Sequence, residues 1–261
     1  MDTIDVPAIR AQGERMKAIL GLSVSPVGVR FLDGQEGQVA GAEIVGGHRY
    51  CQAVMKARRG AHVVLDGEGI SCPAAAAAFG FRPLPAGLRS GKGLVGYGIV
   101  SDETVGRRMF EAMPRLEPGQ VKALYLFPLE QAKQAPDVVI VEAEVEQLMW
   151  INLAYLHATG GERVYSTTAI LQATCVDSTI IPYLEGRLNF GYGCYGCRDA
   201  TDLGGSETVV GFPAAVLPAV VDHLAFLAQK AIPNSRSKRA WGTLERHQEN
   251  EHQDKIGRAH V

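Results

Sequence analysis

The sequence predicts a mixed α/β fold, in which helices pack against a mixed sheet. Three observations favour this class. Segments with helical and strand-like hydrophobic periodicity alternate along the chain. Hydrophobic residues make up 46% of the 261 residues and charged residues only 21%, so the chain has enough apolar material for a substantial core. No tandem repeat of fixed period interrupts the alternation. The length allows one large domain or two small ones.

The individual elements follow from spacing and from start and stop signals. Residues 5–20 have apolar positions at helical spacing, and a proline follows Cys72 at the start of an alanine run. Residues 101–113 begin with Ser-Asp and stop at Pro114, as short helices do. The predicted helices are 5–20, 50–58, a segment from 72, 101–113, 145–157 and 216–231. The predicted strands are 27–32, 62–65, 123–127 and 137–143. Residues 82–98, rich in Gly and Pro, are predicted to be a long loop.

The last stretch of the chain differs in composition from the rest. Residues 236–261 are polar and lack periodic hydrophobicity, which predicts disorder. The final six residues, IGRAHV, match one reading frame of a widely used sequencing adapter, so we hypothesise that part of this tail is not natural protein. Genomic DNA that encodes IGRAHV at this locus would refute that hypothesis. His252 and His260 therefore receive no functional weight.

Charge and hydropathy exclude several function classes. The 26 Lys and Arg residues against 28 Asp and Glu give a net charge of −2, which argues against nucleic acid or an anionic membrane as partner. The N-terminal segment has acidic residues where a signal peptide has basic ones, and no run reaches the ~20 apolar residues of a membrane span. We therefore expect a cytoplasmic protein whose partner is a small molecule or a redox protein.

Familiar nucleotide and hydrolase motifs give little support to other activities. Gly91, Gly93 and Gly96 have the G-x-G-x-x-G spacing of dinucleotide-binding proteins, but that motif needs a strand before it and a helix after it. Here RPLPAGLRS precedes it, so a flexible loop is the better interpretation. The P-loop, H-E-x-x-H and G-x-S-x-G motifs are absent from the sequence.

The five cysteines are the strongest chemical signal. They are Cys51, Cys72, Cys175, Cys194 and Cys197. An odd number in a reducing compartment favours free thiols, metal ligands or redox chemistry over a disulfide scaffold. The C-x-x-C pair lies in a glycine-rich bend that can curve around a ligand, and the other three stand at the edges of predicted elements. Thiols at helix starts have lowered pKa values and bind metal well.

Several interpretations of these cysteines stay open. Four thiolates hold an Fe–S cluster or a zinc ion, although the spacing matches neither a ferredoxin nor a zinc ribbon. His48 with Cys51, Cys194 and Cys197 is a competing Cys₃His zinc set, and His48 is equally well explained as a surface residue. Arg49 and Arg198, each beside a cysteine, are candidates for cofactor binding or ordinary solvated charges. Isolated buried cysteines also simply pack as small apolar residues.

An ordered set of segments resembles a known family. PVGVRFL, RYCQAV, ISCPAAAAAFGF, PDVVIV, GCYGCR and ETVVGFP, in this order over residues 20–235, are similar to the uncharacterised ArCR family, domain of unknown function 169. The resemblance implies a single cytoplasmic domain over residues 1–235. It also implies that Cys51, Cys72, Cys175 and Cys194, with Arg198, fall in the segments that mark the family, whereas Cys197 lies in a spacer. It implies no substrate and no catalytic residue.

We therefore expect the cysteines to converge on one site, and we consider three hypotheses for it. The first is an Fe–S cluster or another thiolate-coordinated metal, zinc being the alternative, with a redox or electron-transfer role. The second is a thiol-based oxidoreductase that uses Cys194 and Cys197. The third is a small-anion-binding module, in which residues 91–98 and Arg198 hold the anion and the cysteines merely pack.

Overall fold

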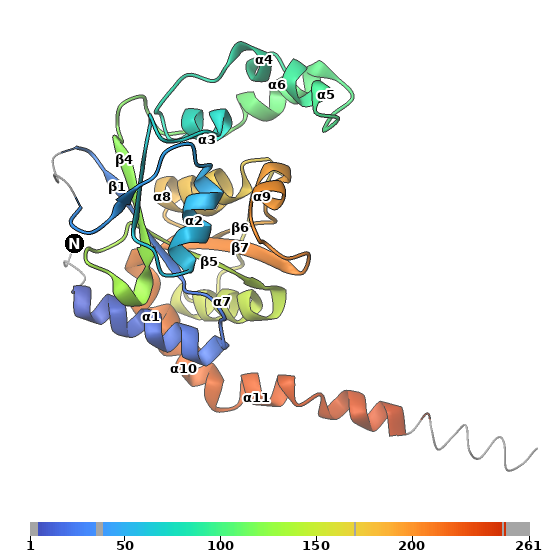
Figure 1. Cartoon of the computed structure of the whole chain (residues 1–261). Helices are drawn as coiled ribbons and strands as arrows, with labels where there is room; N and C mark the ends of the chain where they lie inside the picture. Colours follow the sequence, from blue (N-terminus) through green and yellow to red (C-terminus); the bar gives the residue numbers. More distant parts are fainter. Residues whose placement is uncertain (1–4, 35–38, 170, 247, 249–261) are drawn as a thin grey trace, which may run out of the picture.

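A single mixed sheet runs through the computed structural model, which describes residues 5–34, 39–169, 171–246 and 248 (Figure 1). The strand order among these residues is β2-β3-β4-β1-β5-β7-β6. The strands are β1 (Val27–Leu32), β2 (Glu43–Ile44), β3 (Val63–Asp66), β4 (Ala123–Pro128), β5 (Val138–Glu144), β6 (Asn189–Gly191) and β7 (Glu207–Pro213). Neighbouring strands pair antiparallel, except that β2 and β3 are parallel. The predicted α/β class with one mixed sheet is confirmed.

Both faces of the sheet are buried, and the central strands show why. In β5, Val138 and Ile140 belong to the core on one face, whereas Val139 and Val141 belong to the core on the other. Side chains alternate between faces along a strand, so a continuous apolar run supplies two separate cores. This explains why strands β4 and β5 contain runs of consecutive apolar residues.

Three long helices cover one face of the sheet (Figure 1). They are α1 (Val6–Leu20), α7 (Val145–Ala158) and α10 (Leu217–Gln229). Met16, Ile151 and Leu224 are fully buried against the sheet and against one another. Each helix lies within two residues of its predicted bounds, because an apolar stripe of this length is a strong helical signal.

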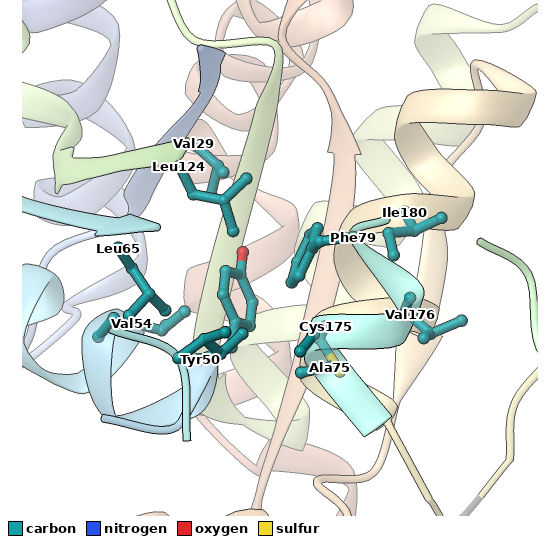
Figure 2. Close-up of a cluster of buried hydrophobic side chains, with 14 of the residues drawn as sticks. Val29, Tyr50, Val54, Leu65, Ala75, Phe79, Leu124, Cys175, Val176 and Ile180 are labelled. Atoms are coloured by element: carbon teal, nitrogen blue, oxygen red, sulfur yellow. The ribbon is translucent and has the colours of Figure 1, made fainter. Parts of the chain in front are cut away.

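The opposite face holds shorter helices, from which the candidate site is built. They are α2 (Tyr50–Arg58), α3 (Pro73–Ala78), the π-helix η2 (Ala173–Ile180) and α8 (Ile181–Glu185). Their core is centred on the rings of Tyr50 and Phe79, whose centroids are 4.8 Å apart. Figure 2 shows Cys175 beside Ala75 in this core, at the side of these rings where α3 and η2 meet.

The predicted loop at 82–98 is in part helical, and in this respect the prediction was wrong. It contains α4 (Ala86–Arg89) and α5 (Lys92–Gly96), which lie with α6 (Glu103–Glu111) at one end of the molecule (Figure 1). Gly91 has φ 86°, and a Cβ there would lie 2.0 Å from the Glu103 carbonyl oxygen. Gly91 is therefore required for close packing against α6. Among the described residues, the element that directly precedes this glycine-rich segment is helix α4.

Several elements were not predicted. These are β2, β6, β7, η2, α8 and α9 (Tyr195–Ala200), together with the 3₁₀ turns η1 (Leu129–Gln131) and η3 (Ala214–Val216). Most are too short for hydrophobic periodicity to mark them. All residues of the π-helix are buried, so its sequence lacks the separate polar and apolar faces that mark an amphipathic helix. The hydrogen-bond pattern of a π-helix is also rare in proteins.

The C-terminal segment begins with further helix. After α11 (Ala231–Arg236), residues 239–246 are helical. The disorder expected over residues 236–261 stays a prediction. Trp241 and Leu244 on this stretch are exposed, so the helix packs little apolar surface against the domain. The IGRAHV segment lies outside the described residues. Within the described residues, no single helix is both long and apolar enough to cross a bilayer.

Candidate functional site

All five cysteines line one pocket of about 500 Å³, which we call the cysteine pocket. One wall consists of the first turns of α2, α3, η2 and α9. Mostly apolar residues from the segment 85–110 complete the lining, among them Leu88, Leu94 and Phe110. The expected convergence of the cysteines is therefore present in the structure. Whether they bind a metal stays a prediction.

Each cysteine is placed by the start of a helix. Cys51 is the second residue of α2, and Cys175 is the third residue of η2. Cys72 and Cys194 are the N-cap residues of α3 and α9, and Cys197 lies one turn into α9. Backbone N–H groups in the first turn of a helix have no partner within that helix. One of them, the N–H of Cys197, donates to Cys194 Sγ at 3.2 Å.

Close packing of η2 on the sheet brings Cys175 to the pocket. Gly211 in β7 has no side chain, and a Cβ there would lie only 1.7 Å from the carbonyl oxygen of Ser178. At Gly191 in β6, a Cβ would lie 2.7 Å from the carbonyl oxygen of Ala173. Two glycines on adjacent strands thus allow the backbone of η2 to rest directly on the sheet.

The π-helix is held by polar contacts within the protein interior. Gln172 at its N-cap adopts a left-handed conformation with φ 63°, which is uncommon for a residue other than glycine. Thr179 Oγ1 donates to the Thr174 carbonyl at 2.7 Å and is hydrogen-bonded to the Tyr50 hydroxyl at 2.9 Å. These bonds tie η2 to α2, so Cys51 and Cys175 have a fixed relation. Backbone irregularity of this kind is frequent at functional sites.

Cys51 and Cys197 affect each other's ionisation. The Cys51 thiol is the hydrogen-bond partner that most lowers the pKa of Cys197, to about 6. Further donors are Thr174 Oγ1, 3.5 Å from Cys197 Sγ, and Thr201, and Arg198 adds a favourable charge. The same hydrogen bond, followed by burial, raises the pKa of Cys51. The interaction of the two thiols thus favours ionisation of Cys197 over ionisation of Cys51.

The other buried thiols are held in the neutral form. Burial raises the pKa of Cys175, and the charges of Cys72 and Cys194 raise it further. Burial also raises the pKa of Cys194, with smaller contributions from Cys197 and Cys72. A thiolate at Cys72 or Cys194 thus disfavours ionisation of Cys175, because like charges in a poorly solvated pocket repel. A cation or metal cluster would remove that repulsion.

The two candidate arginines have different roles in the structure. Arg49 lines the cysteine pocket, and its Nη1 donates to the Gly196 carbonyl at 2.6 Å, which fastens α2 to α9. Arg198 does not line the pocket. Its guanidinium donates to the carbonyl oxygens of Gly204, at 2.8 Å, Glu207, at 3.0 Å, and Tyr192. It acts on the site by fixing the loop around α9 and by its charge near Cys197.

A single metal ion has no ready set of ligands in the described residues. Among them, no three His, Cys, Asp or Glu side chains are grouped closely enough to hold one ion. Zinc–sulfur bonds of ~2.3 Å in a tetrahedron require sulfur atoms about 3.8 Å apart. The proposed Cys₃His set is therefore not assembled, and His48 Nδ1 is instead hydrogen-bonded to the Gly46 carbonyl at 2.7 Å.

Some residues of the site escaped the sequence analysis. Thr174 and Thr201 bond to Cys197 Sγ, and Tyr195 lines the pocket and is largely exposed. The run QATCVDST around Cys175 was a usable signal, since its hydroxyl side chains accompany a cysteine. The sequence does not indicate the apolar part of the pocket lining, because the Gly and Pro content of residues 82–98 predicts a loop.

A family model matches residues 15–223, and its description is "uncharacterised ArCR", a domain of unknown function. The chain belongs to this family. The match includes all five cysteines and both walls of the cysteine pocket. The resemblance stated from the sequence is therefore confirmed.

One curated relative and the solved structures extend the comparison. The chain is 26% identical to an uncharacterised protein of Methanocaldococcus jannaschii over 231 residues, which cover 87% of this chain and 97% of the relative. No solved structure matches the chain. The function of this ArCR protein must therefore be argued from the pocket itself.

Proposed function

We propose that the cysteine pocket binds an Fe–S cluster, or another metal centre held by thiolates, and that the protein transfers electrons through it. The observation that supports this most is the presence of all five cysteines around one pocket. They come from four separate segments of the chain, and all five are free thiols. Chance packing of small apolar residues gives no reason for such a concentration.

Electrostatics support a cationic centre in this place. Burial and mutual repulsion hold Cys175 and Cys194 in the neutral form. Several thiols in one poorly solvated pocket are unfavourable when ionised, and metal cations compensate that charge. The pocket thus has the donor chemistry of a thiolate-bound metal.

The size of the pocket favours a cluster over a single ion. Its volume of about 500 Å³ is far larger than one metal ion fills, and no three ligands in the described part of the chain are gathered around a single point. The ligands of an Fe–S cluster bind different irons and stand farther apart than those of one zinc ion. The N–H of Cys197 that donates to Cys194 Sγ is the kind of hydrogen bond that tunes cluster potentials.

We assign four of the five cysteines as ligands. Cys51, Cys72, Cys175 and Cys194 all line the pocket, and the charges of Cys72 and Cys194 raise the pKa of Cys175. Cys197 is completely buried and accepts hydrogen bonds from threonine hydroxyl groups. We therefore propose that Cys197 is not a ligand of the metal centre and that it interacts with the ligand Cys51.

The setting and the partners follow from the same chemistry. Free thiols and a cluster both require a reducing compartment, so we propose that the protein is cytoplasmic. Tyr97 and Tyr195 are exposed at the pocket and offer aromatic contact to a redox protein or a small molecule. The absence of excess positive charge supports neither nucleic acid nor membrane as partner.

A second candidate function is thiol–disulfide exchange. The sequence predicts Cys194 and Cys197 as the dithiol, and Cys51 is a further candidate because it has the largest effect on the pKa of Cys197. In a thiol–disulfide exchange, the Cys197 thiolate would attack a disulfide substrate and release one thiolate. Cys51 would then attack the mixed disulfide, release the second thiolate and close a Cys51–Cys197 disulfide. This step needs no oxidant besides the disulfide substrate.

Anaerobic purification with cysteine variants tests the first proposal. The wild-type protein is expected to contain iron and acid-labile sulfide and to be brown. Cys72→Ser and Cys194→Ser should lose most of both, whereas the matched control Cys197→Ser should keep them. Far-UV circular dichroism checks that the variants fold.

The same preparation separates the two candidates. Wild-type protein that stays colourless and metal-free after anaerobic reconstitution would contradict the cluster. If glutathione disulfide then produced a Cys51–Cys197 disulfide, detectable by peptide mass spectrometry, the thiol exchange function would replace it.

A further inference from the structure

A second cavity of about 820 Å³, which we call the arginine cleft, lies on the other side of Phe110 from the cysteine pocket. It is bounded by the end of α3, by the residues that follow it, by Arg89 of α4 and by the end of α6. Its floor is apolar and well buried, with Ala77, Leu84, Phe110 and Leu116 among the lining residues. The cysteine-site proposal makes no use of this cleft.

Positive charge is concentrated at its rim. Arg82, Arg89 and Arg115 line the cleft, whereas Glu111 is its single carboxylate. This local excess of cations contrasts with the net charge of −2 for the whole chain. Three guanidinium groups around an apolar floor repel one another, so their grouping does not stabilise the fold.

Two of these arginines are held in place, and the third has no partner. Arg82 donates to the carbonyl of Ile70, and Arg115 Nη2 donates to the carbonyl of Phe110 at 2.7 Å. Within the described residues, the guanidinium of Arg89 forms no hydrogen bond and no ion pair, and only its backbone N–H donates, to the Pro85 carbonyl at 2.9 Å. The anchored groups keep further N–H donors for a ligand, because a guanidinium has five.

The backbone of the cleft is close-packed. Gly80 has φ 72°, and a Cβ there would meet the Glu117 carbonyl oxygen at 2.5 Å. The N–H of Leu116 donates to the Ala78 carbonyl at 2.8 Å, which joins the two sides of the cleft. The cavity is therefore largely formed before any ligand arrives, as small-molecule sites usually are.

We propose that the arginine cleft binds a small organic anion, with a phosphate or carboxylate group at the arginines and an apolar or aromatic body on the floor. Guanidinium groups recognise both anions through paired, charge-assisted hydrogen bonds. The half-buried ring of Phe81 and the buried side chains of Leu84 and Leu116 provide the apolar contact. A ligand there would touch the wall of the cysteine pocket through Phe110, so the site is independent of a metal but adjacent to it.

Fluorescent naphthalene probes test the two halves of this ligand separately. Naphthyl phosphate and naphthalenecarboxylate combine an aromatic body with each anionic group, whereas naphthol lacks the charge and inorganic phosphate lacks the body. We expect saturable binding, measured by fluorescence and calorimetry, for at least one naphthyl anion. The tighter of the two identifies the anionic group. Naphthol and inorganic phosphate should bind at least tenfold more weakly, and added salt should weaken the binding of the anion.

Charge variants of the cleft have expected effects of opposite sign. Arg89→Gln should weaken binding of the naphthyl anion about tenfold, since it removes a charged hydrogen bond. Glu111→Gln should tighten it several-fold. Arg108→Gln, an exposed position of α6 outside the cleft lining, is the matched control and should leave it unchanged. All are surface changes, and thermal unfolding verifies their folding.

Three results would overturn the proposal. They are no saturable binding of either naphthyl anion, equal affinity for naphthol, and wild-type affinity in Arg89→Gln. The cysteine variants are not needed for this experiment, so its failure leaves the cluster proposal untouched.

Discussion

Arg58 and Glu142 form an ion pair inside the protein that connects the elements of the cysteine pocket. Arg58 Nε lies 3.2 Å from Glu142 Oε2, and both side chains are at most 3% exposed. Arg58 also contacts Asp202, which follows α9. The pair thus joins α2 to β5 and to the end of α9, and α2 and α9 supply three of the five cysteines. Burial raises the pKa of Glu142 to about 8, although Arg58 offsets part of that effect.

Glu142→Gln is expected to change how stability depends on pH. The pKa of Glu142 is about 8 in the folded protein and close to 4.5 in the unfolded chain. Between these values the folded state binds more protons, so the free energy of unfolding falls as pH rises. The wild type should lose a few kcal/mol more than Glu142→Gln between pH 5 and pH 8.5. Urea unfolding at several pH values measures this, and parallel pH profiles for the two proteins would contradict it.

At the scale of elements, the contact between η2 and the sheet positions Cys175. The backbone carbonyl of Ser178 occupies the place where a side chain of residue 211 would stand. All residues of η2 are buried, Ser178 and Thr179 among them. The helix therefore cannot move away from the sheet without displacing its neighbours. The packing of a π-helix on a glycine in β7 is thus a local condition for the assembly of the site.

Gly211→Ala should therefore destabilise the protein by about 3 kcal/mol or more, because overpacking forces backbone shifts. Metal content should fall with it, since Cys175 moves with η2. Gly205→Ala is a suitable control, because a Cβ at Gly205 meets nothing within 4 Å. Chemical denaturation compares the two variants. Equal stability of Gly211→Ala and the wild type would show that η2 does not need this close approach.

The fold as a whole was largely predictable, and the exceptions have physical causes. In long amphipathic or apolar segments such as α10 and β5, the spacing of apolar residues predicts the type of element. The π-helix and β6 lack such a period, because burial on all sides or a length of three residues removes it. The convergence of the cysteines was predicted from their positions at helix starts. The influence of Cys51 on the pKa of Cys197 was not predicted, because only tertiary packing brings these two segments of the chain to one pocket.

X-ray absorption at the iron edge, on protein purified without oxygen, tests the central claim most directly. It reports the atoms that surround iron and does not depend on the choice of variants. The account predicts a shell of sulfur neighbours together with an iron neighbour, as in a cluster held by thiolates. An iron environment of only oxygen and nitrogen, or protein that holds no iron after anaerobic reconstitution, would contradict it.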